Sequence, residues 1–391
     1  MIKKLMLEKA DRLFHLPPVL DDFLPRKSRK KLLGQEIIDL ARFNWPGPKV
    51  EKAISNGDCL ATDEETAALM EKTAAWYRAR YGIKVLPAKE IFIGGNIRQI
   101  LGLLALAFFD PSDIILIPDP GIWHYRAAAV LASAETVPYH VSEKNGFKPV
   151  ISSISNNLAR MAKAMILNRP HNPSGALIGK EDLHEILHLA GRDNLMLILD
   201  QAFDGFAEDQ HPTSLFALPG GRKVALELYS FAYNFGRPLP SIGFAVGQPA
   251  LISGLRGVAK IMGHSLTQHQ VQLGLAACEN PNDGLDEMRI QFARNRDVLD
   301  QLCQKIRLFP AEHRSGPYYW AKLPGRKQSR RFCRNLYLQC GVLAVPGVAF
   351  GENGEGYIRF SLTAPYESCQ RALEASNRMF QPLRERKAAD G

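Results

Sequence analysis

The chain has 391 residues, of which 46% are hydrophobic and 23% charged. These values are ordinary for a globular protein and exclude a small disulfide-stapled scaffold. The 49 Lys and Arg residues exceed the 40 Asp and Glu residues by nine. This excess lies in short scattered clusters without interleaved aromatic residues, so we expect no nucleic-acid partner. The six cysteines form no Cys-x-x-Cys pair, so no metal site is expected.

The N-terminus and the longest apolar run predict the cellular compartment of the protein. A glutamate and a lysine interrupt residues 1–9 before any signal-type apolar region forms. The longest apolar run, 100–109, is far shorter than a membrane span. We therefore expect a cytoplasmic protein without membrane contact.

Strands and helices alternate over the first two thirds of the chain. Short apolar runs of the buried type predict strands, and apolar residues at helical spacing predict helices. In chain order we expect a helix at 66–81, a strand at 90–93, a helix at 97–109, a strand at 113–118, a helix at 123–133, a strand at 164–167, a helix at 180–190, and strands at 195–199, 225–229 and 243–246. This alternation predicts an α/β fold with a doubly wound, mainly parallel sheet, whose ligand lies at the carboxyl ends of the strands.

The pattern changes after about residue 249. The remaining chain predicts a helix at 285–306, a basic loop, an alternating segment at 341–345, a strand at 357–362 and a helix at 367–380. We expect a smaller α+β domain made of residues 1–44 and 281–391, beside a large domain made of residues 45–280.

Three segments at expected strand ends carry a resemblance. They are Asn168-Arg-Pro-His-Asn-Pro-Ser-Gly175, Asp200-Gln-Ala-Phe203 and the stretch 230–247, which begins Ser-Phe-Ala-Tyr. Their order and spacing resemble the class I/II aminotransferases, which are pyridoxal-phosphate enzymes of fold type I. The resemblance is closest to the LL-diaminopimelate aminotransferase branch and runs from Ala10 to Arg359. It implies the fold type I architecture for nearly the whole chain.

The resemblance implies roles for five residues. Asp200 matches the carboxylate that holds the pyridine nitrogen protonated, and Asn172 matches the amide that contacts the phenolic oxygen. Ser230 is the first residue of the third segment, and the resemblance implies that it also binds the cofactor. Arg359 matches the arginine that grips the substrate α-carboxylate bidentately. Tyr233 stands where the family has its Schiff-base lysine, and it is the candidate acid or base in place of that lysine.

Other positions also depart from the family pattern. Ala232 replaces a serine, Ser241 replaces the phosphate-binding arginine, and the phosphate-contacting tyrosine of the family falls at about Leu60. The loss of these three phosphate donors weakens the expected binding of pyridoxal phosphate or pyridoxamine phosphate by several powers of ten. Phe203 also replaces the tyrosine that helps the phenolic oxygen. The segment from Gly94 to Arg98 still resembles the family's phosphate-binding helix start.

Two readings of function remain open. The first is a non-canonical enzyme or a catalytically silent pseudoenzyme, lysine-less, that binds a small carboxylate or an amino acid. The alternative is an aminotransferase, dependent on pyridoxal or pyridoxamine phosphate, that acts on an amino acid. Ordinary transamination is not expected without the Schiff-base lysine. His171 and His264 are further candidates for the proton carrier. The resemblance also implies a homodimer, or a heterodimer with a paralogue.

Overall fold

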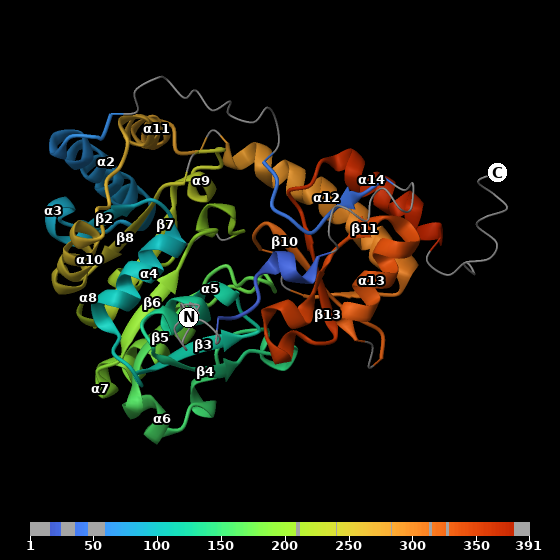
Figure 1. Cartoon of the computed structure of the whole chain (residues 1–391), viewed down its shortest axis with the longest axis horizontal. Coiled ribbons are helices and arrows are strands. Elements are labelled where there is room, and N and C mark those ends of the chain that lie inside the picture. Colours follow the sequence, from blue (N-terminus) through green and yellow to red (C-terminus); the bar gives the residue numbers. More distant parts are fainter. Residues whose placement is uncertain are drawn as a thin grey trace, which may run out of the picture.

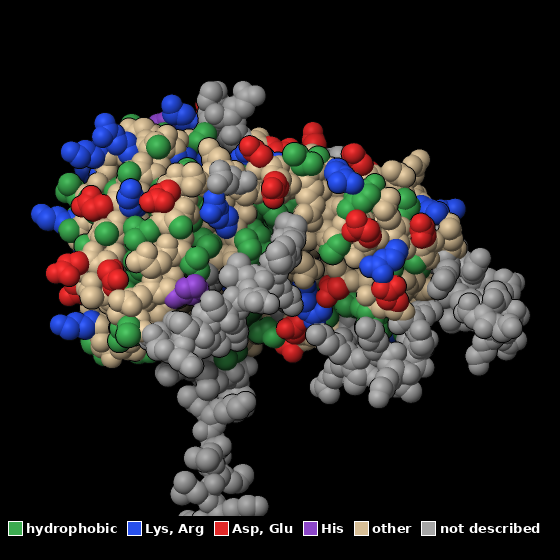
Figure 2. All heavy atoms as spheres, turned by 90° about the horizontal axis from the view of Figure 1, so that it is seen from above, with side chains coloured by type: hydrophobic (Ala, Val, Ile, Leu, Met, Phe, Trp, Pro, Cys, Tyr) green, Lys and Arg blue, Asp and Glu red, His purple; other side chains and the backbone are tan. Residues whose placement is uncertain are grey.

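A computed structural model describes most of the chain, in two layered parts that lie side by side (Figure 1). The described residues are 16–24, 36–45, 59–208, 212–239, 241–282, 284–312, 315–325 and 328–378. Among these residues, no helix is both long and apolar enough to cross a membrane. The same residues contain no cluster of three His, Cys, Asp or Glu side chains suited to a metal ion. Basic and acidic side chains are interspersed over the face seen in Figure 2.

A seven-stranded sheet forms the centre of the first part. The strand order is β2-β8-β7-β6-β5-β3-β4. All pairs from β7 to β4 are parallel, and only β8 runs antiparallel to its two neighbours. The prediction of an α/β fold with a mainly parallel sheet is therefore confirmed. The strands are β2 (Ile91–Gly94), β3 (Ile114–Asp119), β4 (Glu135–His140), β5 (Ala162–Asn168), β6 (Met196–Asp200), β7 (Ala225–Ser230) and β8 (Gly243–Gly247).

Helices cover both faces of this sheet. Alternate residues of each strand point to opposite faces, so Leu197 and Leu199 enter one core while Ile198 enters the other. The first core also takes side chains from α2 (Asp63–Tyr81), α7 (Lys180–Asp193) and α11 (Gln268–Glu279). The second takes them from α4 (Ile97–Phe108), α5 (Trp123–Leu131) and α10 (Pro249–Ile261). Four short helices complete this part: α3 (Pro87–Glu90), α6 (Asn156–Met161), α8 (Gly221–Val224) and α9 (Phe231–Asn234).

The second part is built on a small antiparallel sheet of order β12-β13-β10-β9. A separate two-residue pairing of β1 with β11 joins the N-terminal residues to it. The strands are β1 (Ile38–Asp39), β9 (Phe309–Pro310), β10 (Tyr318–Lys322), β11 (Val342–Leu343), β12 (Val345–Pro346) and β13 (Tyr357–Ser361), and the helices are α12 (Leu285–Ile306), α13 (Ser329–Cys340) and α14 (Tyr366–Ala375). The domain boundaries after residues 44 and 280 stay predictions.

Some expected elements were wrong or missing. The segment interpreted as a basic loop contains α13, whose buried face includes Phe332, Leu336 and Cys340 while its arginines face outward. The charged residues concealed this helical spacing. The edge strand β4 was missed because its residues are mostly exposed and include a proline, which weakens the pattern of a buried strand. The helices α10 and α11 were missed as well.

A buried ion cluster fixes the loop that follows β6. Both oxygens of the fully buried Asp204 carboxylate are used. One accepts a hydrogen bond of 2.6 Å from Arg169 Nη1, and the other accepts bonds from Arg80 Nε at 2.8 Å and from the Tyr81 hydroxyl at 2.9 Å. Because Arg169 directly follows β5, this cluster ties the ends of two central strands together.

We expect Asp204→Ala to destabilise the fold strongly, since it removes the carboxylate that two mostly buried guanidinium groups contact. The expected loss is about 3 to 5 kcal/mol in the free energy of unfolding, measured by urea denaturation. The control is Asp286→Ala, which removes an exposed partner of Arg289 and should cost less than about 1 kcal/mol. Equal losses in the two variants would contradict this interpretation.

Candidate active site

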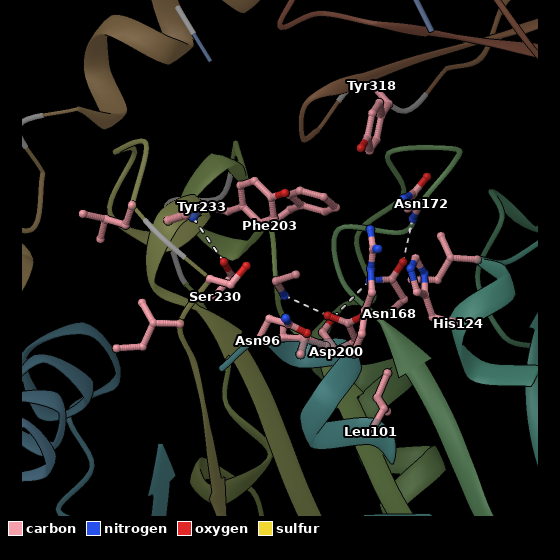
Figure 3. Close-up of a pocket in the computed structure, with 18 of the residues that line it drawn as sticks. Asn96, Leu101, His124, Asn168, Asn172, Asp200, Phe203, Ser230, Tyr233 and Tyr318 are labelled. Carbon is pink, nitrogen blue, oxygen red and sulfur yellow. Dashed lines mark hydrogen bonds between the residues drawn. The ribbon is translucent and has the colours of Figure 1, made fainter. Parts of the chain in front are cut away.

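A cavity of about 340 Å³ lies where β5, β6 and β7 end. The last residue of each strand lines it: Asn168, Asp200 and Ser230. Carboxyl ends of neighbouring parallel strands meet at one edge of a sheet, which is why three segments distant in sequence converge here. Tyr318 reaches the cavity from β10 in the second part (Figure 3). The remaining lining residues are Trp45, Asn96, Ile97, Arg98, Leu101, Ile122, His124, Asn172, Ala202, Phe203, Ala232, Tyr233, Leu239, Ser241 and Ile242.

Asp200 is the only carboxylate that lines the cavity, as far as the described residues show. Its side chain accepts a hydrogen bond of 2.7 Å from the Tyr125 hydroxyl and another of 2.9 Å from the Ala202 N–H. Asn168 donates its side-chain amide to the Asp200 carbonyl at 3.1 Å, which fixes the end of β6. Burial raises the pKa of Asp200 to about 6, even though its two hydrogen bonds oppose the shift. A carboxylate in this position favours a cationic partner.

Asn172 and Arg359 meet beside the cavity. Nη1 of Arg359 donates to Asn172 Oδ1 at 3.0 Å, and Nη2 donates to the Ala41 carbonyl at 3.2 Å. The two residues are 187 positions apart in the sequence and come from different parts of the fold. The prediction that both belong to one site therefore agrees with their placement, while their individual roles stay predictions.

The Arg359 guanidinium lies against two aromatic rings. Its central carbon lies 3.8 Å from the centre of the Tyr318 ring and 4.8 Å from that of Phe350. Arg359 itself is 3% exposed and does not line the cavity, whereas Tyr318 does. Its Nε is buried without a hydrogen-bond partner among the described residues. Arg359 therefore keeps an unused donor behind the Tyr318 ring.

Tyr233 lies in an aromatic wall of the cavity. Its ring stacks on Trp45 with centres 5.7 Å apart, and it packs against Phe43 and Phe203 at 4.8 Å each. Burial raises the pKa of Tyr233 well above its ordinary value, so its hydroxyl stays protonated near neutral pH. This state argues against Tyr233 as a general base. Ser230 caps α9 and lines the cavity, while its role in cofactor binding stays a prediction.

The two histidines considered from the sequence are engaged elsewhere. His171 bonds through one ring nitrogen to Ser174 and through the other to the Pro120 carbonyl, and His264 contacts the Ile93 carbonyl. Neither lines the cavity. Sequence reasoning missed His124, which does line it, because its position follows a turn rather than a strand. The sequence analysis named Arg98 only as the last residue of a segment that resembles a phosphate-binding helix start. In the structure Arg98 is the second residue of α4 and lines the cavity.

The residues that line the cavity suit a pyridoxal phosphate in some respects. Asp200 matches the ring nitrogen, Asn172 matches a polar ring substituent, and the hydroxyls of Ser230 and Ser241 together with Arg98 match an anion. Among the described residues that line the cavity there is no lysine. The fit therefore holds for non-covalent binding of the ring and the anion.

Comparisons with known proteins agree on one family. A family model described as "Aminotransferase class I and II" matches residues 56–375. The chain is 30% identical over 385 residues to the LL-diaminopimelate aminotransferase of Aquifex aeolicus, covering 96% of this chain and 99% of that one. It is 28% identical over 379 residues to the same enzyme of Halothermothrix orenii, covering 94% and 97%.

Solved structures give the same result. A substrate-bound BacF structure from Bacillus subtilis has a TM-score of 0.87 at 25% identity and covers 96% of this chain and 99% of that one. A probable N-succinyldiaminopimelate aminotransferase from Thermus thermophilus has a TM-score of 0.81 at 26% identity and covers 92% and 98%. The predictions of fold type I and of similarity to LL-diaminopimelate aminotransferases are confirmed.

These relatives overturn the expectation of a non-canonical enzyme or a silent, lysine-less pseudoenzyme. The similarity to LL-diaminopimelate aminotransferases extends over 94% or more of this chain. The expectation gave the single residue Tyr233 more weight than this similarity, and it took the loss of individual phosphate donors to mean weak binding of the cofactor. The cavity instead keeps Asp200 among its lining residues and contains the positively charged Arg98.

We predict that Asp200 lowers the stability of the folded protein as the pH rises. Because the folded-state pKa of about 6 exceeds the unfolded value near 3.8, the folded state keeps its proton longer, and stability falls from about pH 4 to pH 6. Asp200→Asn removes this effect while Tyr125 and Ala202 can still bond to the amide. The free energy of unfolding of the variant relative to the parent should therefore rise across this range by at most about 3 kcal/mol. Asp286→Asn is the exposed control, and a pH-independent difference for Asp200→Asn would contradict the prediction.

Proposed function

This chain belongs to the class I and II aminotransferase family, and we propose that it is a pyridoxal-phosphate-dependent aminotransferase that acts on an amino acid. The observation that carries the proposal is the buried Asp200 carboxylate at the end of β6, facing a cavity of about 340 Å³. A buried carboxylate is stabilised by a cation placed against it, and a protonated pyridine ring supplies one.

Different cavity residues would contact different parts of the cofactor. Asp200 would hold the ring nitrogen protonated, and the free side-chain N–H groups of Asn172 would reach the ring oxygen. The hydroxyls of Ser230 and Ser241 would contact the phosphate. When bound, the cofactor supplies an electrophilic carbon and an electron-withdrawing ring for exchange of an amino group.

Arg359 is the proposed partner of the substrate α-carboxylate. Support comes from its buried Nε, which has no hydrogen-bond partner among the described residues, and from its contact with the cavity residue Asn172. A carboxylate reaches the guanidinium once the Tyr318 side chain rotates away from its face. The planar guanidinium of Arg359 then donates two hydrogen bonds to the carboxylate, in a site from which water is excluded.

The aromatic wall around Tyr233 shapes the remainder of the substrate site. Its protonated hydroxyl can donate a hydrogen bond but cannot accept a proton from the substrate near neutral pH. We also propose that the protein works in the cytoplasm as a homodimer or as a heterodimer with a paralogue. Both statements rest on the family resemblance and on the expectations from sequence.

The proposed function predicts transamination by the protein loaded with pyridoxal phosphate. A panel of amino acids that includes diaminopimelate is incubated with 2-oxoglutarate, and glutamate formation is followed. We expect turnover with at least one donor and a change in visible absorbance when that donor is added without 2-oxoglutarate. An absence of both cofactor binding and turnover over the whole panel would refute the function.

A second prediction separates the roles of Arg359 and Asp200. Arg359→Gln should raise KM for the amino acid by about 30-fold or more, because a buried charge-assisted pair is lost, and should leave affinity for pyridoxal phosphate unchanged. Asp200→Ala should instead weaken binding of the cofactor. Arg371→Gln, a change in a half-exposed arginine of α14 that pairs with Glu36, is the control for Arg359. Similar effects of Arg359→Gln and Arg371→Gln on KM would contradict the assignment.

A further inference from the structure

The buried amide of Asn234 joins the short helix α9 to the loop that follows Asp200. Asn234 is the last residue of α9 and is 1% exposed. Its Nδ2 donates to the carbonyl of Gln201 at 3.1 Å and to that of Ala202 at 3.0 Å. Its Oδ1 accepts the N–H of Gly205 at 3.0 Å. One side chain therefore binds three backbone groups of the loop that begins directly after the Asp200 carboxylate.

The surroundings of the Asn234 amide fix its orientation. Nδ2 also donates to the carbonyl of Ser230 at 3.1 Å, one turn earlier in the chain. Three carbonyl oxygens thus face the nitrogen and one N–H faces the oxygen, so a flipped amide would oppose like groups. A Cβ added at Gly205 would lie 2.7 Å from the Cα of Asn234, so the two backbone segments are in direct contact. The amide is therefore held on both sides.

A single peptide group connects this amide to Asp200. The C=O of Gln201 and the N–H of Ala202 belong to the same peptide, which is planar, so they point in opposite directions. The C=O accepts from Asn234, and the N–H donates to Asp200 Oδ1 at 2.9 Å. Rotation of this peptide would break both hydrogen bonds at once. The bond to Asn234 therefore stabilises the orientation in which Asp200 receives its N–H.

We propose that Asn234 is a positioning residue for Asp200, which holds the peptide between Gln201 and Ala202 so that its N–H points at the carboxylate. Asp200 and Ala202 line the cavity, whereas Asn234 does not (Figure 3). Asn234 thus acts through this peptide and not on a ligand. The step from Asp200 to the ring nitrogen of the cofactor rests on the proposed function. The positioning itself rests only on the hydrogen bonds of these four residues.

Electrostatics gives this role a measurable consequence. Burial raises the pKa of Asp200 to about 6, while hydrogen bonds from the Ala202 N–H and the Tyr125 hydroxyl oppose the rise. Tyr125 comes from α5, so its hydroxyl is held independently of Asn234. Loss of the Asn234 amide should weaken the bond from Ala202 and so raise the pKa of Asp200 further. More of the carboxyl would then be protonated at neutral pH, and it would attract a cationic ring less.

The test measures the pKa of Asp200 in the full-length protein without cofactor, by 13C NMR of the labelled carboxyl carbon. Asp200→Asn identifies the resonance. The variant is Asn234→Ser, whose hydroxyl bonds most readily to the Ser230 carbonyl one turn back. The matched control is Asn295→Ser. Asn295, in α12, is also fully buried, and its amide donates to two backbone carbonyls of the segment after β13.

We expect Asn234→Ser to raise the pKa of Asp200 by about 0.5 to 1 and to weaken binding of pyridoxal phosphate at pH 7 by about 2- to 5-fold. Asn295→Ser should change neither quantity. Both variants should unfold at a lower urea concentration than the parent, because each loses buried hydrogen bonds. An unchanged pKa of Asp200 in Asn234→Ser, or equal rises in the two variants, would overturn the positioning role.

The parent protein offers a second measurement that needs no folded variant. The 15N resonances of the Ala202 amide and of the Asn234 side chain should shift together as Asp200 titrates, with one midpoint near its pKa of about 6. The side-chain resonance of Asn295 should not respond. A shift for Ala202 without a shift for Asn234 would overturn the link through the peptide.

The outcome is separable from the proposed function. If Asn234→Ser raises the pKa of Asp200 but the parent binds no pyridoxal phosphate, the positioning role stands and the function fails. If the parent catalyses transamination and Asp200 has the same pKa in the parent and in Asn234→Ser, the function stands and the positioning role fails.

Discussion

The buried carboxylate of Asp200 is the constraint on which the rest of the site depends. It ends the central strand β6, and its burial is offset by hydrogen bonds from Tyr125 and Ala202. Asn168 fixes the same strand end from β5. Four residues further on, Asp204 anchors the following loop through Arg169 and Arg80. The fold therefore holds one buried carboxylate in a fixed position in the cavity wall, where a cationic ring gains most from it.

The residues placed best from sequence are those at the ends of parallel strands. Asn172, Asp200 and Ser230 follow or end three strands that are neighbours in the sheet, and the rule that such ends meet at one edge is enough to bring them together. Arg359 comes from the other part of the fold, and only the family resemblance predicted that it belongs to the same site as Asn172, which it contacts in the structure. Sequence reasoning had no means to predict that Tyr318 and Phe350 would cover its guanidinium, because that depends on how β10 and the β12 region pack against β13.

Functional reasoning from sequence failed where it counted substitutions position by position. Tyr233 and Ser241 differ from the family pattern, but a binding site is defined by groups in space rather than by positions in a motif. Arg98 lines the same cavity from α4, and His124 lines it from α5. The rule that ligands bind at the carboxyl ends of parallel strands predicts neither residue. Both lie in the first turn of a helix whose orientation is set by packing on the sheet. The helix α13 was missed because its exposed arginines interrupt the apolar residues that form its buried face.

The most direct test of the central role of Asp200 is the 15N chemical shift of ring-labelled pyridoxal phosphate bound to the full-length protein. Opposite an ionised Asp200, the pyridine nitrogen should be protonated at neutral pH and should lose that proton in the Asp200→Ala variant. A pyridine nitrogen that is unprotonated in the parent protein, or equally protonated in both proteins, would contradict the account.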